Sequence, residues 1–132
     1  KLVCAATDIT GFGLLGHLAN ICRASKVSAE IFPDRIPAII REIFDLIERG
    51  CVPGGTRDNL KAARQTTDLR SVSQSQRIFL ADAQTSGGLL LCVCESTLPK
   101  VRHVLQRFGT ESAAVIGRII RRRRKQLICT TE

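Results

Sequence analysis

The chain of 132 residues carries 20 lysines and arginines against 12 acidic residues, which gives a formal net charge of +8. Its length suits one domain over residues 1–132, and because methionine is absent we expect this domain to be a piece of a longer protein. No apolar run approaches the roughly 20 residues that a membrane helix needs, and no signal peptide is visible, so we expect no membrane contact and a cytoplasmic location.

The stretch from Ala5 to His17 combines one acid, two hydroxyls and three glycines with the start of a helical pattern. Thr10 stands where an N-cap hydroxyl would accept from free backbone amides, so we predict that a helix begins just after it. The apolar face of this helix repeats at the spacing of one helix side, through Leu14, Leu15, Leu18, Ile21 and Cys22.

The same stretch has the composition of a phosphate site. Gly11 and Gly13 lack a Cβ and would let the backbone turn tightly beside an anion, which a helix start also favours. Asp8 lies just upstream and could give a carboxylate oxygen to Mg²⁺ bound to that anion. The alternative is a plain helix cap beside a solvated carboxylate, since Gly-rich helix starts are common.

Two elements are predicted next. Val27–Phe32 alternates as a short strand that Pro33 ends. Pro37 suits the first turn of a helix that Gly50 stops. The apolar stripe of this helix is Ile39, Ile40, Ile43, Phe44 and Ile47.

A Pro-Gly-Gly loop over residues 51–56 follows. A more polar helix is predicted to open at Arg57 or Asp58 and to run towards Thr67. Residues 66–76 are rich in Thr, Ser and Gln, so we expect a flexible connection there.

The second half begins with a turn-rich loop over residues 82–88. Leu89–Cys94 is a continuous apolar run, typical of a strand covered on both faces, and is the candidate for the centre of the sheet. Pro99 suits the start of another helix, which Gly109 ends. The inward face predicted for this helix is Leu98, Val101, Val104, Leu105 and Phe108.

Two strands are predicted last, over Ala113–Ile120 and Gln126–Thr130, as a pair joined by the basic run Arg121–Lys125. Helices and strands in mixed order predict an α+β or mixed α/β layered domain. The run contributes much of the positive charge, and its two readings are a solvated turn or a contact with an anionic partner such as RNA. With five Phe and no Tyr or Trp, stacking platforms for bases are not expected.

The six cysteines make no CxxC pair, and neither histidine is spaced with them as a zinc ligand usually is. We therefore expect free, mostly buried thiols in a reducing compartment. Cys92 and Cys94 flank Val93, so they are predicted to point to one face of a buried strand.

Residues 7–17, Thr-Asp-Ile-Thr-Gly-Phe-Gly-Leu-Leu-Gly-His, resemble the motif that opens the C-terminal domain of the selenophosphate synthetase (selenide, water dikinase) family. Three further stretches match in order: residues 52–56 with Asn59, residues 82–90, and Ile116 with Gly117. The wider family, which includes aminoimidazole ribonucleotide synthetase, shares the domain but typically lacks this form of the first motif.

The resemblance implies a three-layer mixed α/β (α+β) fold like the C-terminal domain of aminoimidazole ribonucleotide synthetase. It implies that the whole protein, a homodimer, makes selenophosphate, AMP and phosphate from ATP, selenide and water, as a step of selenium metabolism. It implies that residues 1–132 are the C-terminal fragment of a longer, two-domain synthetase. An N-terminal domain of the same chain would supply the nucleophile and most ATP contacts, and Asp8 would lend one carboxylate to Mg²⁺. Thr10, Gly11 and Gly13 would shape the ATP cleft, and the isolated piece is expected to be inactive.

Individual residues of these motifs allow alternative roles. His17 is either a hydrogen-bonded structural residue or a proton carrier. Asp82 is a weaker candidate for a second metal ligand. Ala83 replaces the Pro that usually follows this acid in the family, which should loosen the loop. The rival to the synthetase reading is a non-catalytic module that contacts RNA or another anionic partner through the tip Arg121–Lys125.

Overall fold

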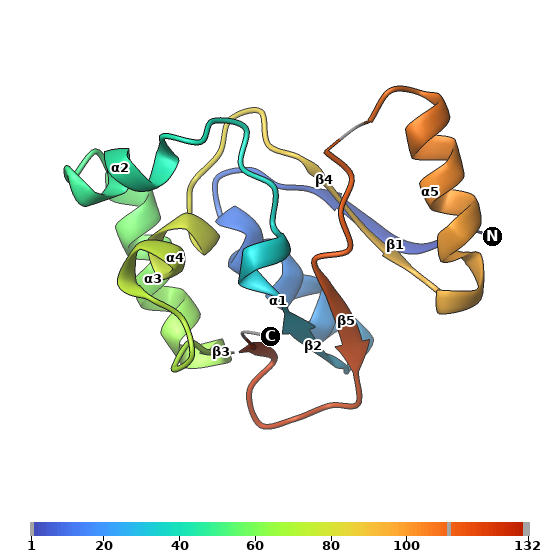
Figure 1. Ribbon diagram of the computed structural model, residues 1–132. Coiled ribbons are helices and arrows are strands. Elements are labelled where there is room, and N and C mark those ends of the chain that lie inside the picture. Colours follow the sequence, from blue (N-terminus) through green and yellow to red (C-terminus); the bar gives the residue numbers. More distant parts are fainter. Residues whose placement is uncertain (1, 111, 131–132) are drawn as a thin grey trace.

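The computed structural model describes residues 2–110 and 112–130 and has an α+β architecture (Figure 1). Its strands are β1 (Val3–Asp8), β2 (Ser28–Ile31), β3 (Thr67–Asp68), β4 (Leu89–Val93), β5 (Gly117–Ile120) and β6 (Leu127–Cys129). Its helices are α1 (Gly13–Ser25), α2 (Ile43–Glu48), α3 (Gly54–Thr66), α4 (Gln74–Leu80) and α5 (Leu98–Arg107), with single turns η1 (Pro33–Arg35) and η2 (Glu95–Thr97). The α+β class expected from the mixed order of elements is confirmed.

The strands form two sheets. β1 and β4 pair antiparallel, and the other four strands lie in the order β3-β6-β2-β5. In that sheet β2 runs parallel to β6 and antiparallel to β5, so the sheet is mixed. Figure 1 shows α2, α3 and α4 gathered at one side of the molecule, α5 beside β1 and β4 at the other, and α1 between them.

The prediction that the last two strands pair with each other is wrong, because β2 lies between β5 and β6. The connection between them wraps around the start of β2, where the side chain of Ser28 is fully buried. The Ser28 hydroxyl accepts from the backbone N–H of Arg123 at 2.8 Å and donates to the carbonyl of Lys125 at 3.1 Å. The basic run is therefore a crossover held by a buried serine, and it is not the tip of a hairpin.

The core forms around the apolar face of α1, which packs against strands of the larger sheet and against α3 and α4. The predicted stripe of this helix is confirmed, because Leu14, Leu15, Leu18 and Cys22 are buried and Ile21 packs against them half-buried. Fully buried side chains from the sheet, such as Ile31 and Leu127, complete the centre.

Two predicted helices have different bounds in the structure. α2 begins at Ile43, so the predicted start at Pro37 is wrong; Ile39 is 93% exposed and has no buried surface to favour a helix there. α3 begins at Gly54, earlier than predicted, because Pro53 is in the extended conformation of an N-cap and the glycines can occupy the first turn. Gly50 ends α2 at φ 82°, as predicted.

Residues 66–76 are structured, so the expected flexible connection is wrong. They contain β3, the buried side chains of Leu69 and Val72, and the start of α4. Ser73 and Gln76 form a capping box there, in which the side-chain oxygen of each residue accepts from the backbone N–H of the other. The polar composition of this segment reflects a helix cap and turn.

β4 and α5 exist as predicted, but both are less covered than predicted. β4 pairs only with β1 within the described residues, and Leu89 is 66% exposed, so β4 is not the centre of a covered sheet. On α5 only Val101 is buried, while Val104 and Phe108 are exposed. No helix in the described part of the chain is long and apolar enough to cross a bilayer.

Candidate functional site

Asp8 is the last residue of β1 and lies opposite Leu89, the first residue of β4. Its side chain is exposed. Among the described residues no hydrogen bond or ion pair engages the Asp8 carboxylate. Both oxygens are therefore open to a ligand at this end of the two-stranded sheet.

The segments that carry the three longer motifs meet beside Asp8. The N–H of Ile9 donates to the carbonyl of Gly88 at 2.9 Å, and the N–H of Gln84 donates to the carbonyl of Thr10 at 3.2 Å. Gly87 lies so close to the carbonyl of Ile9 and the side-chain oxygen of Gln84 that a Cβ would clash with both. The loop of residues 82–88 is thus fastened along the chain that follows Asp8.

The α3 motif joins the same assembly through Asn59. Its side-chain amide donates to the carbonyl of Gly11 at 2.7 Å and to the carbonyl of Ala81 at 3.1 Å. One side chain therefore holds the first loop (residues 9–12) beside the end of α4, where the third loop (residues 82–88) begins. The sequence indicated that Asn59 belonged to a motif, but only the structure shows what it binds.

Thr56 makes a second tie between α3 and the third loop. Its hydroxyl, fully buried, donates to the Asp82 carboxylate at 3.0 Å and accepts from the N–H of Ala83 at 3.1 Å. One oxygen of Asp82 is thereby engaged in holding α3, which reduces what Asp82 can offer a metal. The N–H that Ala83 retains, and that a proline would lack, has a partner here.

Thr10 does not cap the first helix, so that prediction is wrong. α1 begins at Gly13, and its N-cap residue is Phe12, which makes no side-chain cap. The hydroxyl of Thr10 instead lies 3.1 Å from Nε2 of His17, and the Thr10 N–H donates to that nitrogen at 3.2 Å. The hydroxyl is engaged because His17, one turn into α1, reaches back across the loop.

His17 is a hydrogen-bonded structural residue in this arrangement. Because a backbone N–H can only donate, Nε2 must accept, which places the ring proton on Nδ1. The ring also lies against Phe12, with centroids 5.8 Å apart. The Phe and His that mark this form of the motif thus hold the loop that presents Gly11.

The two glycines of the loop have different surroundings. A Cβ on Gly11 would meet nothing within 4 Å, and the residue is exposed, so its backbone faces open space. Gly13 has φ 66°, and a Cβ there would lie 2.7 Å from the carbonyl oxygen of Ala81. Gly13 therefore serves close packing of α1 on the third loop, while Gly11 remains accessible.

Among the described residues no group of three or more His, Cys, Asp and Glu side chains could hold a metal ion. Asp8 fits Mg²⁺ by the chemistry of its donor, since an exposed, unpaired carboxylate is the hard oxygen ligand that Mg²⁺ prefers. One carboxylate alone is not a complete site, so the remaining ligands would have to come from a substrate or from another part of the protein.

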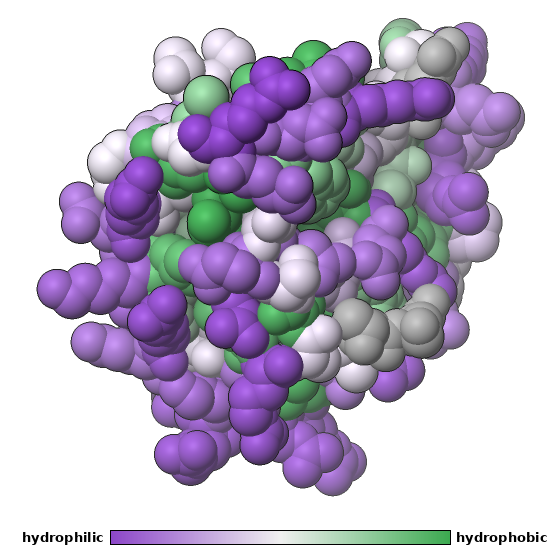
Figure 2. Space-filling model, turned by 60° about the vertical axis from the view of Figure 1, so that its left-hand side comes forward, coloured by the Kyte–Doolittle hydropathy of each residue, from purple (hydrophilic) through white to green (hydrophobic). Residues whose placement is uncertain are grey.

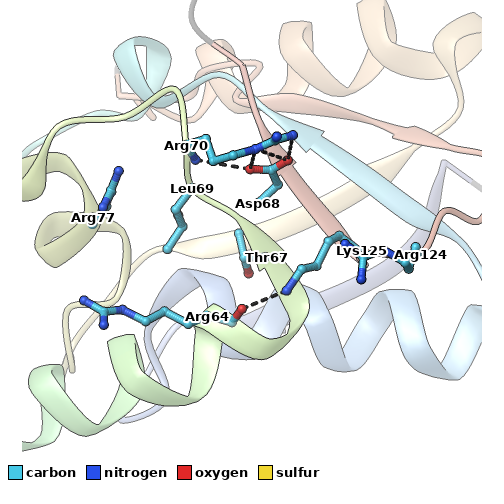
Figure 3. A pocket seen from close by; sticks show the side chains of 8 residues that line it. All are labelled: Arg64, Thr67, Asp68, Leu69, Arg70, Arg77, Arg124 and Lys125. Atoms are coloured by element: carbon cyan, nitrogen blue, oxygen red, sulfur yellow. Dashed lines mark hydrogen bonds and ion pairs between the residues drawn. The ribbon is translucent and has the colours of Figure 1, made fainter.

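Two surface hollows exist elsewhere, and Asp8 lines neither of them. One, of about 420 Å³, is ringed by basic side chains from α3, α4 and the crossover to β6 (Figure 3). Lys125 is committed there to the carbonyls of Arg64 and Gln65, at 2.8 Å each. The hydrogen bond from the Arg70 side chain lowers the pKa of Asp68, which lies in the same wall.

The face in Figure 2 is largely hydrophilic, with apolar surface visible only in patches.

The three long motifs predicted from the sequence come together at the end of β1. The hydrogen bonds of Thr56 and Asn59 were not predicted, and their place in a motif was the only sequence signal for them. The prediction that the cysteines are mostly buried is wrong: Cys22 and Cys129 are buried, but Cys4, Cys51 and Cys94 are exposed. The six are free of disulfides, as predicted.

Comparison with known proteins gives two findings. The family model described as AIR synthase related protein, C-terminal domain, matches residues 1–130. Curated relatives named selenide, water dikinase include those of Sulfurovum sp. (strain NBC37-1), 42% identical over 107 residues and 81% of this chain, and Photorhabdus laumondii, 40% identical over 113 residues and 86% of this chain. The chain spans 30% and 32% of the length of these two relatives.

Proposed function

Because this chain belongs to the family of the AIR synthase related protein C-terminal domain, we propose that it is the C-terminal domain of a selenide, water dikinase. The relatives that bear this name are about three times as long as the matched region, which supports a role as one domain of a larger enzyme. The reaction proposed for the whole protein converts ATP, selenide and water to selenophosphate, AMP and phosphate.

Within that reaction we assign Asp8 to Mg²⁺ and the loop of Thr10, Gly11 and Gly13 to the wall of the ATP cleft. Mg²⁺, when bound, would neutralise charge on the ATP phosphates, which is the main requirement of phosphoryl transfer. Asp8 would hold this ion by one carboxylate oxygen. Gly11 would let the loop approach the nucleotide, and Gly13 would set the loop's position by packing on Ala81.

The observation that carries the proposal is the open carboxylate of Asp8 on a strand end that three motif loops hold in place. A carboxylate retained only for folding would be expected to cap a helix or to pair with a neighbouring base. Asp8 does neither in the described part of the chain. The hydrogen bonds of Asn59 and Thr56 hold the neighbouring loops in place without engaging either carboxylate oxygen of Asp8.

The proposal includes the other half of the enzyme. An N-terminal domain of the same chain would supply the nucleophile and the remaining Mg²⁺ ligands, and two such chains would form a homodimer. The free cysteines suit the reducing cytoplasm, where we place the protein. The rival reading, in which Arg121–Lys125 binds RNA, gains nothing from the structure, because this run is a crossover whose Lys125 is tied to α3.

The test is the change Asp8→Asn in the full-length protein that contains this chain. The amide keeps the size of the side chain but removes the charge that Mg²⁺ requires. We expect selenide-dependent formation of AMP from ATP to fall in kcat/KM by about a hundredfold or more, which exceeds the loss typical of an outer ligand partner. The Mg²⁺ concentration for half-maximal rate should rise, and the urea unfolding midpoint should not change.

Asp58→Asn is the matched control, since Asp58 is also exposed but lies on the outside of α3. This variant should keep the activity of the parent protein. Equal activity of Asp8→Asn and Asp58→Asn at limiting Mg²⁺ would show that Asp8 does not bind Mg²⁺ in the reaction. A parent protein that forms no AMP when selenide is supplied would contradict the proposed reaction itself.

A further inference from the structure

Two exposed thiols face each other at the opposite end of the sheet from Asp8. Cys4 lies within β1, and Cys94 follows the last residue of β4. Their sulfur atoms are 3.4 Å apart, within hydrogen-bonding distance, although the residues are separated by 90 positions in the chain. Neither cysteine is used by the site described above.

The backbone explains why these thiols meet. The register between β1 and β4 shifts between Val3 and Ala5, so Cys4 occupies a bulge with no partner directly opposite. Bulges re-aim a side chain, and here the thiol is turned towards Cys94. The hydroxyl of Thr97 lies 3.2 Å from the carbonyl of Leu2 and 3.0 Å from that of Cys94, and so bridges the two chain segments.

We infer that Cys4 and Cys94 form a redox-active dithiol, a modification site that closes to an intramolecular disulfide by exchange with small-molecule disulfides. A disulfide bond is about 2.05 Å long, so the sulfur atoms need to approach by only about 1.4 Å. Both thiols are exposed, so an external disulfide can reach them. The inference stands independently of the proposed enzyme activity.

The exchange proceeds in two steps. The thiolate of Cys4 attacks a small disulfide such as oxidised glutathione, which forms a mixed disulfide and releases one glutathione thiolate. The sulfur of Cys94 then attacks the Cys4 sulfur and displaces the second glutathione. Two cysteine thiols are oxidised, one small disulfide is reduced to two thiols, and the two cysteine protons pass to the released glutathiones.

The surroundings favour this order of attack. The hydrogen bond between the two thiols raises the pKa of Cys94, so Cys94 forms a thiolate less readily than an ordinary cysteine. Burial raises the pKa of Cys92, the other nearby thiol, which lies half-buried within β4. Cys92 is therefore less reactive than the exposed pair.

Oxidation would also act on the strand that carries Asp8. Cys4, Ala6 and Asp8 occupy the exposed face of β1, because its residues alternate in burial. A disulfide at Cys4 would join the start of β1 to the segment that leads into α5. It would thereby restrict sliding or fraying of the strand that ends at the candidate metal ligand.

The test incubates the purified full-length protein in buffers of increasing oxidised-to-reduced glutathione ratio, followed by alkylation and tryptic digestion without reduction. Trypsin should release residues 2–23 and 78–100 as separate peptides. We expect them to appear as one disulfide-linked species, with fragmentation placing the link between Cys4 and Cys94 rather than at Cys22 or Cys92. Added reductant should separate them again.

Cys94→Ser should abolish the link and leave Cys4 carrying glutathione, with about tenfold or more of this adduct than in the parent protein, because no neighbouring thiol resolves it. Cys51→Ser is the control, since Cys51 is exposed with no sulfur neighbour among the described residues, and it should leave the link unchanged. Separate glutathione adducts on Cys4 and Cys94 in the parent protein, a link through Cys92, or no oxidation of the pair at ratios that modify Cys51 would each overturn the inference.

Discussion

Replacing Gly13 by alanine tests whether this glycine serves packing within the chain. Gly13 begins α1 with φ 66°, a left-handed conformation that costs an alanine about 1–2 kcal/mol. The new methyl group would also lie 2.7 Å from the carbonyl oxygen of Ala81 and 2.8 Å from that of Asp82. Both obstacles are backbone atoms, so no side-chain rotation can relieve them.

The expected cost of Gly13→Ala follows from these two terms. Forcing an extra methyl into a packed site typically costs about 1–3 kcal/mol. Added to the conformational cost, this gives a loss of roughly 2–5 kcal/mol in the free energy of unfolding, a large share of the stability of an ordinary domain. We expect the added methyl group to push the start of α1 away from the third loop, which would account for part of this loss of stability.

Urea unfolding followed by circular dichroism measures this loss, with Gly11→Ala as the matched control. Gly11 is two residues away, is exposed, and has nothing within 4 Å of an added Cβ. Gly11→Ala should therefore change the free energy of unfolding by no more than about 1 kcal/mol. If the two variants unfold at the same urea concentration, the close contact of α1 with Ala81 and Asp82 is refuted.

Two further predictions concern buried groups. Thr56→Val should cost about 1–3 kcal/mol in the free energy of unfolding, because it leaves the N–H of Ala83 and one oxygen of Asp82 without their partner, whereas Thr56→Ser should retain most of the stability. Burial raises the pKa of Cys22 to about 11 and that of Cys129 to about 12, from an ordinary 9.0. The unfolded chain therefore loses these protons first, so the free energy of unfolding should fall as pH rises from about 9 towards 12. Urea midpoints measured across that range should decline less steeply in Cys129→Ala than in the parent protein; an equal slope would show that Cys129 is not protected.

The local patterns in the sequence predicted elements well where one face of an element is buried. The stripe of α1 packs as its spacing indicates, since a helix with apolar residues at i, i+3 and i+4 buries them together. The stripe predicted for α2 and the inward face predicted for α5 were only partly right, because no neighbouring element covers most of the Ile39 and Phe108 side chains. Periodicity indicates which side chains could share a face, but it carries no information on whether a partner surface exists.

The candidate site shows the same division. Asp8 and Gly11 were recognisable from a short motif, because acid, turn and helix start lie within a few residues of one another. The role of Thr10 was misjudged, because its hydroxyl can bond either to the first amides of the helix or to a side chain one turn further on. The choice depended on where His17 points, which no local pattern encodes.

The amino-acid order by itself indicated the family, the apolar face of the first helix and the candidate carboxylate of Asp8, because each rests on short local patterns. It did not predict the strand that Asp8 ends or the start of α1 at Gly13. Only the tertiary structure decided that β2 separates β5 from β6, that Asn59 joins two distant loops, and that Cys4 meets Cys94. The contact of Asn59 with Gly11 joins residues 48 positions apart, and that of Cys4 with Cys94 joins residues 90 positions apart. The free energy of such contacts comes from burial and hydrogen bonds that exist only once the chain has closed on itself.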